Sequence, residues 1–368
     1  MTKPSKPTYE STWGIALIVV MIAVTVLSVL AAAFAYAMKV ETKLAQNSNS
    51  ETELIWLGRS GVEFARYVLA LQLAIGNEPY DGLNQKWAGG PGGQGTTNSA
   101  LAGISLNDYH LGDGRFSVTI TDLERKYNIN IADQAALEQS LRLIGVDVGD
   151  ASSIAGSILD WIDPDDNTHV GGTESDFYQT MDPPYYAKNQ PIDDLSELLL
   201  VRGVTPDIFW GGGATNHPPA AFQHRTPHAG APSSPTGYAI GLVDIFTPIS
   251  NWRININTAS LTTLQMIPYV DEAIAAKIIE LRAGPDGVQG TDDDMPAGMP
   301  GVRVEDVLIT AGLNRQAIPL AARYCGVRSS TFEVQVDAEV AGYTRRFFAT
   351  LARNNVRDVQ VLGFYWKE

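Results

Sequence analysis

The sequence predicts an α+β protein in which a long amino-terminal helix packs on a small antiparallel sheet, with a large helical insertion between strands. Three observations predict this. Residues 14–38 form an uncharged apolar run, residues 116–120 and 331–340 alternate apolar and polar side chains, and helical hairpin patterns fill the region between them. A chain of 368 residues is long enough for two or three domains.

The apolar run Gly14–Met38 is the most informative stretch of the chain. About 20 uncharged apolar residues suffice to span a bilayer as a helix, and a helix satisfies its own backbone polar groups inside lipid. We therefore expect a short leader over residues 1–14 and a transmembrane helix over residues 15–38. Lys3 and Lys6 precede the run, so by the positive-inside bias they favour the opposite side of the membrane for the bulk of the chain, whereas Lys39 and Lys43 after the run oppose that bias.

The helical pattern continues beyond the apolar run. Apolar residues recur at helical spacing at Leu54, Leu57, Val62, Ala65 and Leu69. A secretory signal would have a shorter apolar core and a small-residue cleavage site after it, which this stretch lacks. We predict one long helix, half in lipid and half in water, and the alternative is a plain single-pass anchor.

Residues 39–131 are expected to hold the rest of this helix and the first strands. A Gly- and Asn-rich loop follows the helix, then Phe116, Val118 and Ile120 predict a strand, and residues 127–131 predict a second short one. Residues 328–368 predict three antiparallel strands with turns at Gly342 and at Asn354-Asn355. These strands should join the earlier ones in one sheet.

The first helical insertion is expected over residues 132–253 and resembles a SAM-like module. Residues 135–144 and 151–162 predict a helical hairpin, and a further helix follows at 195–201. Thr205 is a suitable helix N-cap before Pro206. A Gly/Pro-rich loop, Gly211–Pro235, has no periodicity and no function that the sequence reveals.

The second insertion, residues 254–327, has the pattern of a helix-hairpin-helix. We expect Thr258 to cap a helix at 261–267 and a turn at 268–271 to lead into a helix at 272–282. DNA-binding hairpins turn backbone N–H groups toward a phosphate, but this turn lacks glycine and Asp271 adds a negative charge. The net charge is −15. No nucleic-acid partner is expected.

Enzyme motifs are not found in the sequence. There is no nucleophile elbow, P-loop, Rossmann glycine pattern, paired cysteine or HExxH motif. Clustered aspartates would suit a metal-dependent hydrolase, but histidine is scarce and the acids lie in turn-forming sequence. We expect a protein that is not an enzyme.

Two acidic loops carry candidate ligands for a hard cation. Calcium takes six to eight oxygen ligands, and weak extracellular sites work at about 0.1–1 mM. Neither loop has EF-hand spacing, and the alternative is a solvated acidic turn whose repulsion is screened. The first loop contains Asp160, Asp163, Asp165 and Asp166, with Glu174 and Asp176 nearby, and the second contains Asp286, Asp292, Asp293 and Asp294.

Several strings resemble the K-type minor pseudopilin of the type II secretion system. The polar head, the boundary Gly14, the apolar helix and its amphipathic extension are similar to a type IV prepilin or pseudopilin. The order and spacing of five further strings make the resemblance more specific. They are ERKYNINIAD from residue 124, ILDWIDPDDN from 158, GGTESDFYQ from 171, PPYYAKNQPIDDLSELLLVRGVTPDIF from 183 and NINTAS from 255.

This resemblance carries several expectations. It implies cleavage after Gly14 by a prepilin peptidase, which leaves Ile15 as the new amino terminus. Val19 then stands at the fifth mature position, where most pilins have a glutamate, and a carboxylate in lipid is costly unless it is paired. The K-type family lacks this glutamate and is placed at the tip of the pseudopilus. Two departures are the long Gly211–Pro235 loop and Ile15 in place of a more usual aromatic residue or Met.

The resemblance also implies partners and location. The expected partners are other minor pseudopilins, the major pseudopilin, the prepilin peptidase and inner-membrane lipid. The expected location is a bacterial inner membrane, with a single pass and the bulk of the chain in the periplasm. Calcium is implied as a structural ion. The alternatives are a type IV pilus-like minor pilin and a membrane-anchored helix-hairpin-helix protein for DNA uptake.

Overall fold

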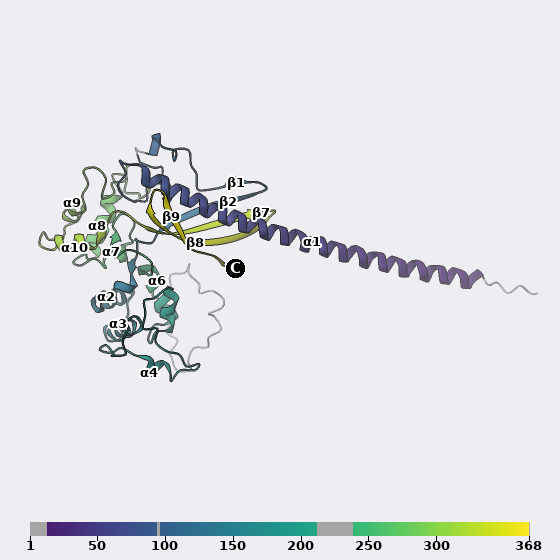
Figure 1. The fold of residues 1–368 in the computed structure, drawn as a ribbon, viewed down its shortest axis with the longest axis horizontal. Helices are drawn as coiled ribbons and strands as arrows, with labels where there is room; N and C mark the ends of the chain where they lie inside the picture. Colours follow the sequence, from purple (N-terminus) through teal and green to yellow (C-terminus); the bar gives the residue numbers. More distant parts are fainter. Residues whose placement is uncertain (1–12, 94–95, 212–237, 368) are drawn as a thin grey trace, which may run out of the picture.

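The computed structural model describes residues 13–93, 96–211 and 238–367, and it is dominated by one helix (Figure 1). Helix α1, Trp13–Ala74, is continuous over 62 residues, as predicted. Its amino-terminal half projects away from the body, whereas its carboxy-terminal half lies along the sheet (Figure 1). The five apolar positions predicted to face the core, from Leu54 to Leu69, are all buried.

The sheet that α1 covers has five antiparallel strands in the order β1-β2-β7-β8-β9. The strands near residue 116 and those of the carboxy-terminal region join in one sheet, as predicted, because β2 pairs with β7 along the whole length of β2. The turn between the last two strands lies at residues 356–357, and the predicted turn residues Asn354 and Asn355 instead end β8. The strands are β1 Tyr109–Leu111, β2 Gly114–Asp122, β7 Thr331–Val340, β8 Tyr343–Asn355 and β9 Asp358–Lys367.

Glycine lets α1 approach the sheet closely. A Cβ atom on Gly58 would lie 2.5 Å from the Phe347 ring, and one on Gly61 would lie 2.5 Å from a Val336 methyl group. Any larger residue at either position would therefore push the helix off the sheet. The core beneath the helix is apolar on both sides, so burial of this surface holds the two layers together.

The insertion between β2 and β7 forms a helical head beyond the end of the sheet at which α1 ends (Figure 1). Its short strands pair in parallel, β3 with β4 and β5 with β6. Its helices are α2 Gln134–Ile144, α3 Val148–Ile162, α4 Ser175–Tyr178, α5 Pro206–Trp210, α6 Leu242–Ile245, α7 Leu261–Leu264, α8 Glu272–Arg282, α9 Val304–Thr310 and α10 Ile318–Tyr324. Its strands are β3 Tyr127–Asn128, β4 Phe246–Thr247, β5 Ile254–Asn255 and β6 Cys325–Gly326. The head also contains 3₁₀ helices at Ile129–Ile131 and Leu195–Leu200, and two more lie between α1 and β1, at Lys86–Ala88 and Thr96–Asn98.

The head consists of two similar units that the sequence analysis had not related to each other. Unit 1 runs from β3 to β4 and unit 2 from β5 to β6. Each begins with a short strand and an Asn-Ile-Asn string, continues through a capped helical hairpin and an acidic loop, and ends with the parallel partner of its first strand. The acidic loop follows the second hairpin helix in both units, after α3 in unit 1 and after α8 in unit 2.

The same asparagine organises both units. In unit 1 the Asn130 side chain accepts from the Ile192 N–H at 2.7 Å and donates to the Ile192 carbonyl at 3.0 Å. In unit 2 the Asn257 side chain accepts from the Ala297 N–H at 2.8 Å and donates to the Ala297 carbonyl at 3.0 Å. Each amide thereby holds the far end of the acidic loop of its own unit.

The hairpins also share their capping chemistry. Asp147 caps α3 and Asp271 caps α8, each by accepting a backbone N–H. The residue two positions before each cap has a positive φ, Gly145 in unit 1 and Tyr269 in unit 2. Asp271 is thus occupied as a cap at the end of the hairpin where a DNA-binding version would present free N–H groups.

Two local predictions in the head were wrong. We expected Thr258 to cap α7, but Ser260 does so, and the buried Thr258 hydroxyl instead donates to Asp122 at 2.5 Å. The short strand expected over residues 127–131 ends at Asn128, because Asn128 caps a 3₁₀ turn that follows. The Gly211–Pro235 loop lies outside the described residues after Gly211.

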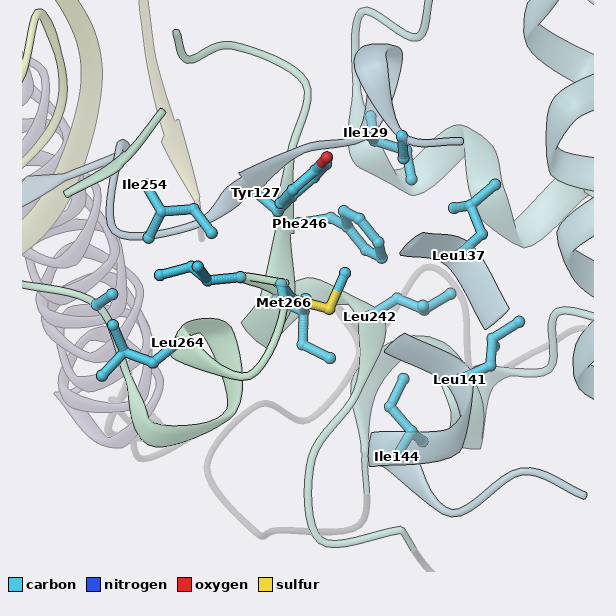
Figure 2. Close-up of a cluster of buried hydrophobic side chains, with 14 of the residues drawn as sticks. Tyr127, Ile129, Leu137, Leu141, Ile144, Leu242, Phe246, Ile254, Leu264 and Met266 are labelled. Carbon is cyan, nitrogen blue, oxygen red and sulfur yellow. The ribbon is translucent and has the colours of Figure 1, made fainter. Parts of the chain in front are cut away.

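Both units contribute to one hydrophobic core. Figure 2 shows Leu137 and Leu141 of α2 near Leu242 and Phe246, with Leu264 and Met266 of unit 2 lying in the same cluster. Several of these side chains are fully buried. The two units therefore form one head, although the sequence predicted them as separate insertions.

A buried polar junction joins the head to the sheet. Asn255 of unit 2 donates to Asp122 at the end of β2 and to the Asp81 carbonyl after α1. Asp81 is also paired with Arg353 of β8 at 2.5 Å, and both side chains are buried. Burial and the nearby Glu124 raise the pKa of Asp122 to about 7.

Candidate cation site in the first acidic loop

Asp160, near the end of α3, is the centre of the first acidic loop. It is fully buried, and its two carboxylate oxygens accept from different parts of the loop. Oδ1 accepts from the His169 backbone N–H at 2.8 Å and lies 2.6 Å from the His169 ring Nδ1, while Oδ2 accepts from the Thr173 N–H. The loop therefore folds back over the helix end and brings His169 onto Asp160.

The turn that makes this contact depends on glycine. A Cβ atom on Gly172 would collide with Asp160 Oδ2, and Gly171 has a φ of +79°. No other residue fits both positions without strain or displacement. The Gly-Gly pair of the loop is thus required for the close approach of the backbone to the carboxylate.

Two further carboxylates in the loop have buried oxygens without partners. Asp163 Oδ1 and both oxygens of Glu174 are inaccessible to solvent and accept no hydrogen bond. The Glu174 residue as a whole is only 8 % exposed. A buried carboxylate without hydrogen bonds costs several kcal/mol unless it is neutralised or paired, so this arrangement calls for a proton or a cation.

The pKa of Glu174 is affected by the other acids of the loop. Burial raises its pKa most, and the negative charges of Asp160 and Asp163 add to the rise, so that the pKa reaches about 7. The pKa of Asp163 is also raised, by burial first and then by the charge of Asp165. A divalent cation among these groups would remove both the repulsion and the unmet demand for donors.

The remaining predicted acids of this loop lie at its exposed rim. Asp165 Oδ1 accepts from the Asn167 N–H at 2.8 Å, and Asp166 Oδ1 accepts from the Asn189 amide at 3.0 Å. Beside them a hollow of about 480 Å³ is lined by residues that include Asp166, Thr173 and Glu174. It gives an ion a path from solvent to the loop.

The second acidic loop is differently arranged. Asp286 accepts from the Val288 N–H at 2.7 Å, and Asp294 accepts from the Gly290 N–H at 2.8 Å. Asp293 accepts from the Asp286 N–H and from the Thr291 hydroxyl, and the hydrogen bond from Thr291 lowers its pKa most. Asp292 is exposed. The loop thus meets most of its own acceptors, whereas the first loop does not.

Within the described residues, the donors that converge as a metal-ligand set are Asp160, Asp163 and His169, whose ligand atoms all lie within 4.8 Å of one another. The loop fits a cation, because Asp163 Oδ1 in this set and both oxygens of the neighbouring loop residue Glu174 are buried without a partner. Sequence analysis found the acids but missed His169. The signal it overlooked is a histidine placed just before the Gly-Gly turn.

The membrane-side residues lie on α1. The helix starts at Trp13, so the backbone of Gly14 and Ile15 is helical, and residues 1–12 of the leader lie outside the described residues. Val19 is 59 % exposed on the projecting half. Among the described residues α1 is a helix long and apolar enough to cross a membrane, and its most apolar window is not buried in the body.

Comparison with known proteins gives a consistent result. Residues 114–210 match the family model described as type II secretion system (T2SS), protein K, and residues 250–289 match a helix-hairpin-helix motif. Type II secretion system protein K of Pseudomonas aeruginosa is 23 % identical over 294 residues, which is 76 % of this chain and 75 % of that protein. The chain is thus similar to type II secretion system protein K over about three quarters of its length.

Other members of the protein K family match over shorter segments. The Klebsiella pneumoniae protein is 27 % identical over 114 residues, 27 % of this chain and 35 % of that protein. The chain thus spans about a third of that relative. The fold is similar to a chain in the crystal structure of the GspK-GspI-GspJ complex from enterotoxigenic Escherichia coli, with a TM-score of 0.60, 19 % identity, and coverage of 88 % of this chain and 99 % of that one.

Proposed function

We propose that this protein is a structural minor pseudopilin that stands at the tip of the type II secretion pseudopilus and helps to initiate or cap the fibre during protein export. The observation that carries the proposal is α1 itself. Its carboxy-terminal half is fixed to the sheet through Gly58 and Gly61, and its apolar half is left free of the body. A free apolar helix of this length suits both a membrane and a bundle of partner helices.

The shape of the head supports a position at the end of a fibre. Both helical units lie to one side of the sheet and share one core (Figures 1 and 2). A subunit within the shaft must accept neighbours above and below, which a head of this breadth would obstruct. Val19 offers no carboxylate to the amino terminus of a subunit above it. Both features fit a first subunit.

Location and processing follow from the same proposal. The chain would cross the bacterial inner membrane once through residues 15–38 and hold its head in the periplasm. A prepilin peptidase would cut between Gly14 and Ile15. Mass spectrometry of the membrane-extracted protein should find Ile15 at the amino terminus, and an intact Met1 in a host that has the peptidase would contradict the proposal.

The partners in this proposal are other minor pseudopilins and the major pseudopilin. The similar chain in the Escherichia coli structure was solved in a complex with GspI and GspJ. Co-expression of the tagged chain with the other pseudopilins of its own secretion system should yield a complex containing two or more of them. Recovery of the tagged chain alone, with all of them present in the membrane, would overturn the proposal.

Calcium is the cation that we propose for the acidic loops, with a structural role. In the first loop Asp160, Asp163 and Glu174 would hold it, since Asp163 and Glu174 supply buried oxygens without partners and Asp160 lies beside Asp163. In the second loop Asp286, Asp293 and Asp294 would have to exchange their hydrogen bonds for it. Millimolar calcium should raise the melting temperature of the detergent-purified chain and a chelator should lower it, whereas no shift with either would remove calcium from the account.

A further inference from the structure

Helix α1 is supported at both ends and bare between them. At the end held by the body, Ser50 is buried and Glu51 is paired with Arg345 of β8 at 3.1 Å. Residues 16–45 are all exposed. Of these, the polar stretch over residues 39–45 follows the part that we assign to the bilayer, so neither lipid nor the body supports it.

Residues 46–50 connect this bare stretch to the body and have the sequence Gln-Asn-Ser-Asn-Ser. Asparagine and serine have low helix propensity, because their side chains compete with the helix for backbone hydrogen bonds. A solvated helix of fewer than about 12–15 residues is marginally stable even when it consists of good helix formers. A weak helix-forming run therefore lies where α1 leaves the body.

The residues around this run add to its weakness. Lys39 and Lys43 lie one turn apart on the helix, and like charges at this spacing repel each other. Thr42 and Thr52 each donate their hydroxyl to the backbone carbonyl four residues earlier, at 2.8 and 3.3 Å. Hydrogen bonds of this type weaken and bend helices. Local interactions on both sides of residues 46–50 therefore make bending easier there.

The parts of α1 beyond the run resist bending. Gly58 and Gly61 bring the helix against Phe347 and Val336 of the sheet, so the helix cannot turn there without disrupting the core. In a bilayer the apolar half stays helical, because its backbone polar groups find no partners in lipid. A change in the direction of the head must therefore arise between these two parts.

We propose that residues 46–50 are a joint in α1, at which the helix unwinds transiently and lets the sheet and head tilt relative to the apolar half. The joint allows the head to face partners in different directions while the apolar run stays in lipid. The inference rests on the membrane insertion proposed above and not on pseudopilus assembly. Flotation of the chain with lipid vesicles tests insertion by itself, so failure of insertion and failure of the joint are distinguishable.

Hydrogen exchange of the full chain in lipid nanodiscs, measured by mass spectrometry, tests the joint. We expect the amides of residues 46–50 to exchange about tenfold faster than those of residues 54–69, which pack on the sheet. They should also exchange about threefold faster than those of residues 39–45, which are equally free of the body. Equal exchange at residues 46–50 and 39–45 would show that exposure alone sets the rate, and would overturn the proposal.

Two matched variants separate the effect of sequence from that of position. Asn47→Ala, Ser48→Ala and Asn49→Ala together should slow exchange at the joint about threefold, because alanine is the best helix former. Ser60→Ala removes a hydroxyl that donates to the Trp56 carbonyl at 2.8 Å, on the part of α1 held by the sheet, and should leave exchange at the joint unchanged. Unaltered exchange in the triple variant would refute the assignment.

Distances between spin labels measure the tilt itself. Labels at Glu41→Cys and Arg59→Cys span the joint, whereas labels at Trp56→Cys and Ala74→Cys span the part held by the sheet, and Cys325 is buried and stays unlabelled. Both pairs are equally far apart along α1, about 27 Å when the helix is straight. We expect a broad distribution that extends to shorter distances for the first pair, narrowed by the triple alanine variant, and a single narrow distance for the second. Equally narrow distances for both pairs would overturn the proposal.

Discussion

The two acidic loops lie at equivalent places in two similar helical units, yet they treat their carboxylates in opposite ways. The loop of unit 2 turns its own N–H groups onto Asp286, Asp293 and Asp294. The loop of unit 1 leaves Asp163 Oδ1 and both Glu174 oxygens buried without donors. The comparison teaches that the path of the backbone, and not the number of acids, decides whether an acidic loop supplies donors to its own carboxylates.

Unit 2 also differs from unit 1 in how it is attached. Asn255 of unit 2 rests on the buried acids Asp81 and Asp122 of the sheet region. The corresponding Asn128 of unit 1 donates to the Ser250 carbonyl within the head, at 2.7 Å. Unit 2 is thus joined to the body through ionisable groups, whereas the corresponding asparagine of unit 1 contacts neutral backbone within the head.

The largest effect is expected at the asparagines that the units share. Asn257→Ala should lower the free energy of unfolding by about 3 kcal/mol, since it removes three buried hydrogen bonds and leaves the Ala297 backbone groups unpaired. Asn130→Ala should cost about 2 kcal/mol, because its surroundings are half-buried. Urea unfolding followed by circular dichroism would measure both, and a negligible loss in either variant would contradict the organising role of the asparagine in that unit.

The next effect concerns the unpartnered carboxylate. In the presence of chelator, Glu174→Gln should stabilise the protein by about 1–2 kcal/mol, because a neutral amide replaces a charge that has no donors. The same variant should lose the gain in melting temperature that a divalent cation gives the parent. Thermal unfolding with and without the ion measures both, and a destabilised Glu174→Gln under chelator would argue that the carboxylate has partners.

The attachment of unit 2 should depend on pH. The folded-state pKa of Asp122 is raised to about 7 from its ordinary value of 3.8. The folded protein therefore holds this proton more tightly than the unfolded chain, so stability is fully present below about pH 4 and falls as pH rises toward 7. Asp122→Asn should flatten this slope between pH 4 and 7 in chelator-containing buffer. An identical pH dependence in the variant would place the titrating group elsewhere.

The smallest effect is expected in the loop of unit 2. Thr291→Ala removes a hydroxyl that donates to Asp293 at 2.7 Å at a half-exposed site, and should cost no more than about 1 kcal/mol. Because Asp293 then has one hydrogen bond fewer to give up when an ion binds, the affinity of the loop for calcium should not fall. A loss of several kcal/mol would show that this loop, and not its counterpart, stabilises the head.

Much of the fold was accessible from sequence because it depends on periodicity. The spacing from Leu54 to Leu69 predicted the buried face of α1, and the alternation at Phe116, Val118 and Ile120 predicted β2. Both patterns depend on neighbouring positions alone. The glycines at 58 and 61 had no such signal, because their role is the distance to strands far along the chain.

The candidate site could be predicted only in part, because its contacts also join residues that are far apart in the sequence. Aspartates clustered in sequence marked both loops, but whether a carboxylate is satisfied depends on the path of the backbone. Asp160 is met by the N–H of Thr173, thirteen residues later, and by the ring of His169. Thr258 failed as a predicted cap because Asp122, on a distant strand, takes its hydroxyl.

The central claim is that unit 1 and not unit 2 holds the preferred cation site. An anomalous difference map measured at long wavelength from crystals of the protein grown with calcium tests it directly. The account predicts a peak in the first loop beside Asp160, Asp163 and Glu174, and a weaker peak or none at Asp286, Asp293 and Asp294. A peak at the second loop with none at the first would contradict it.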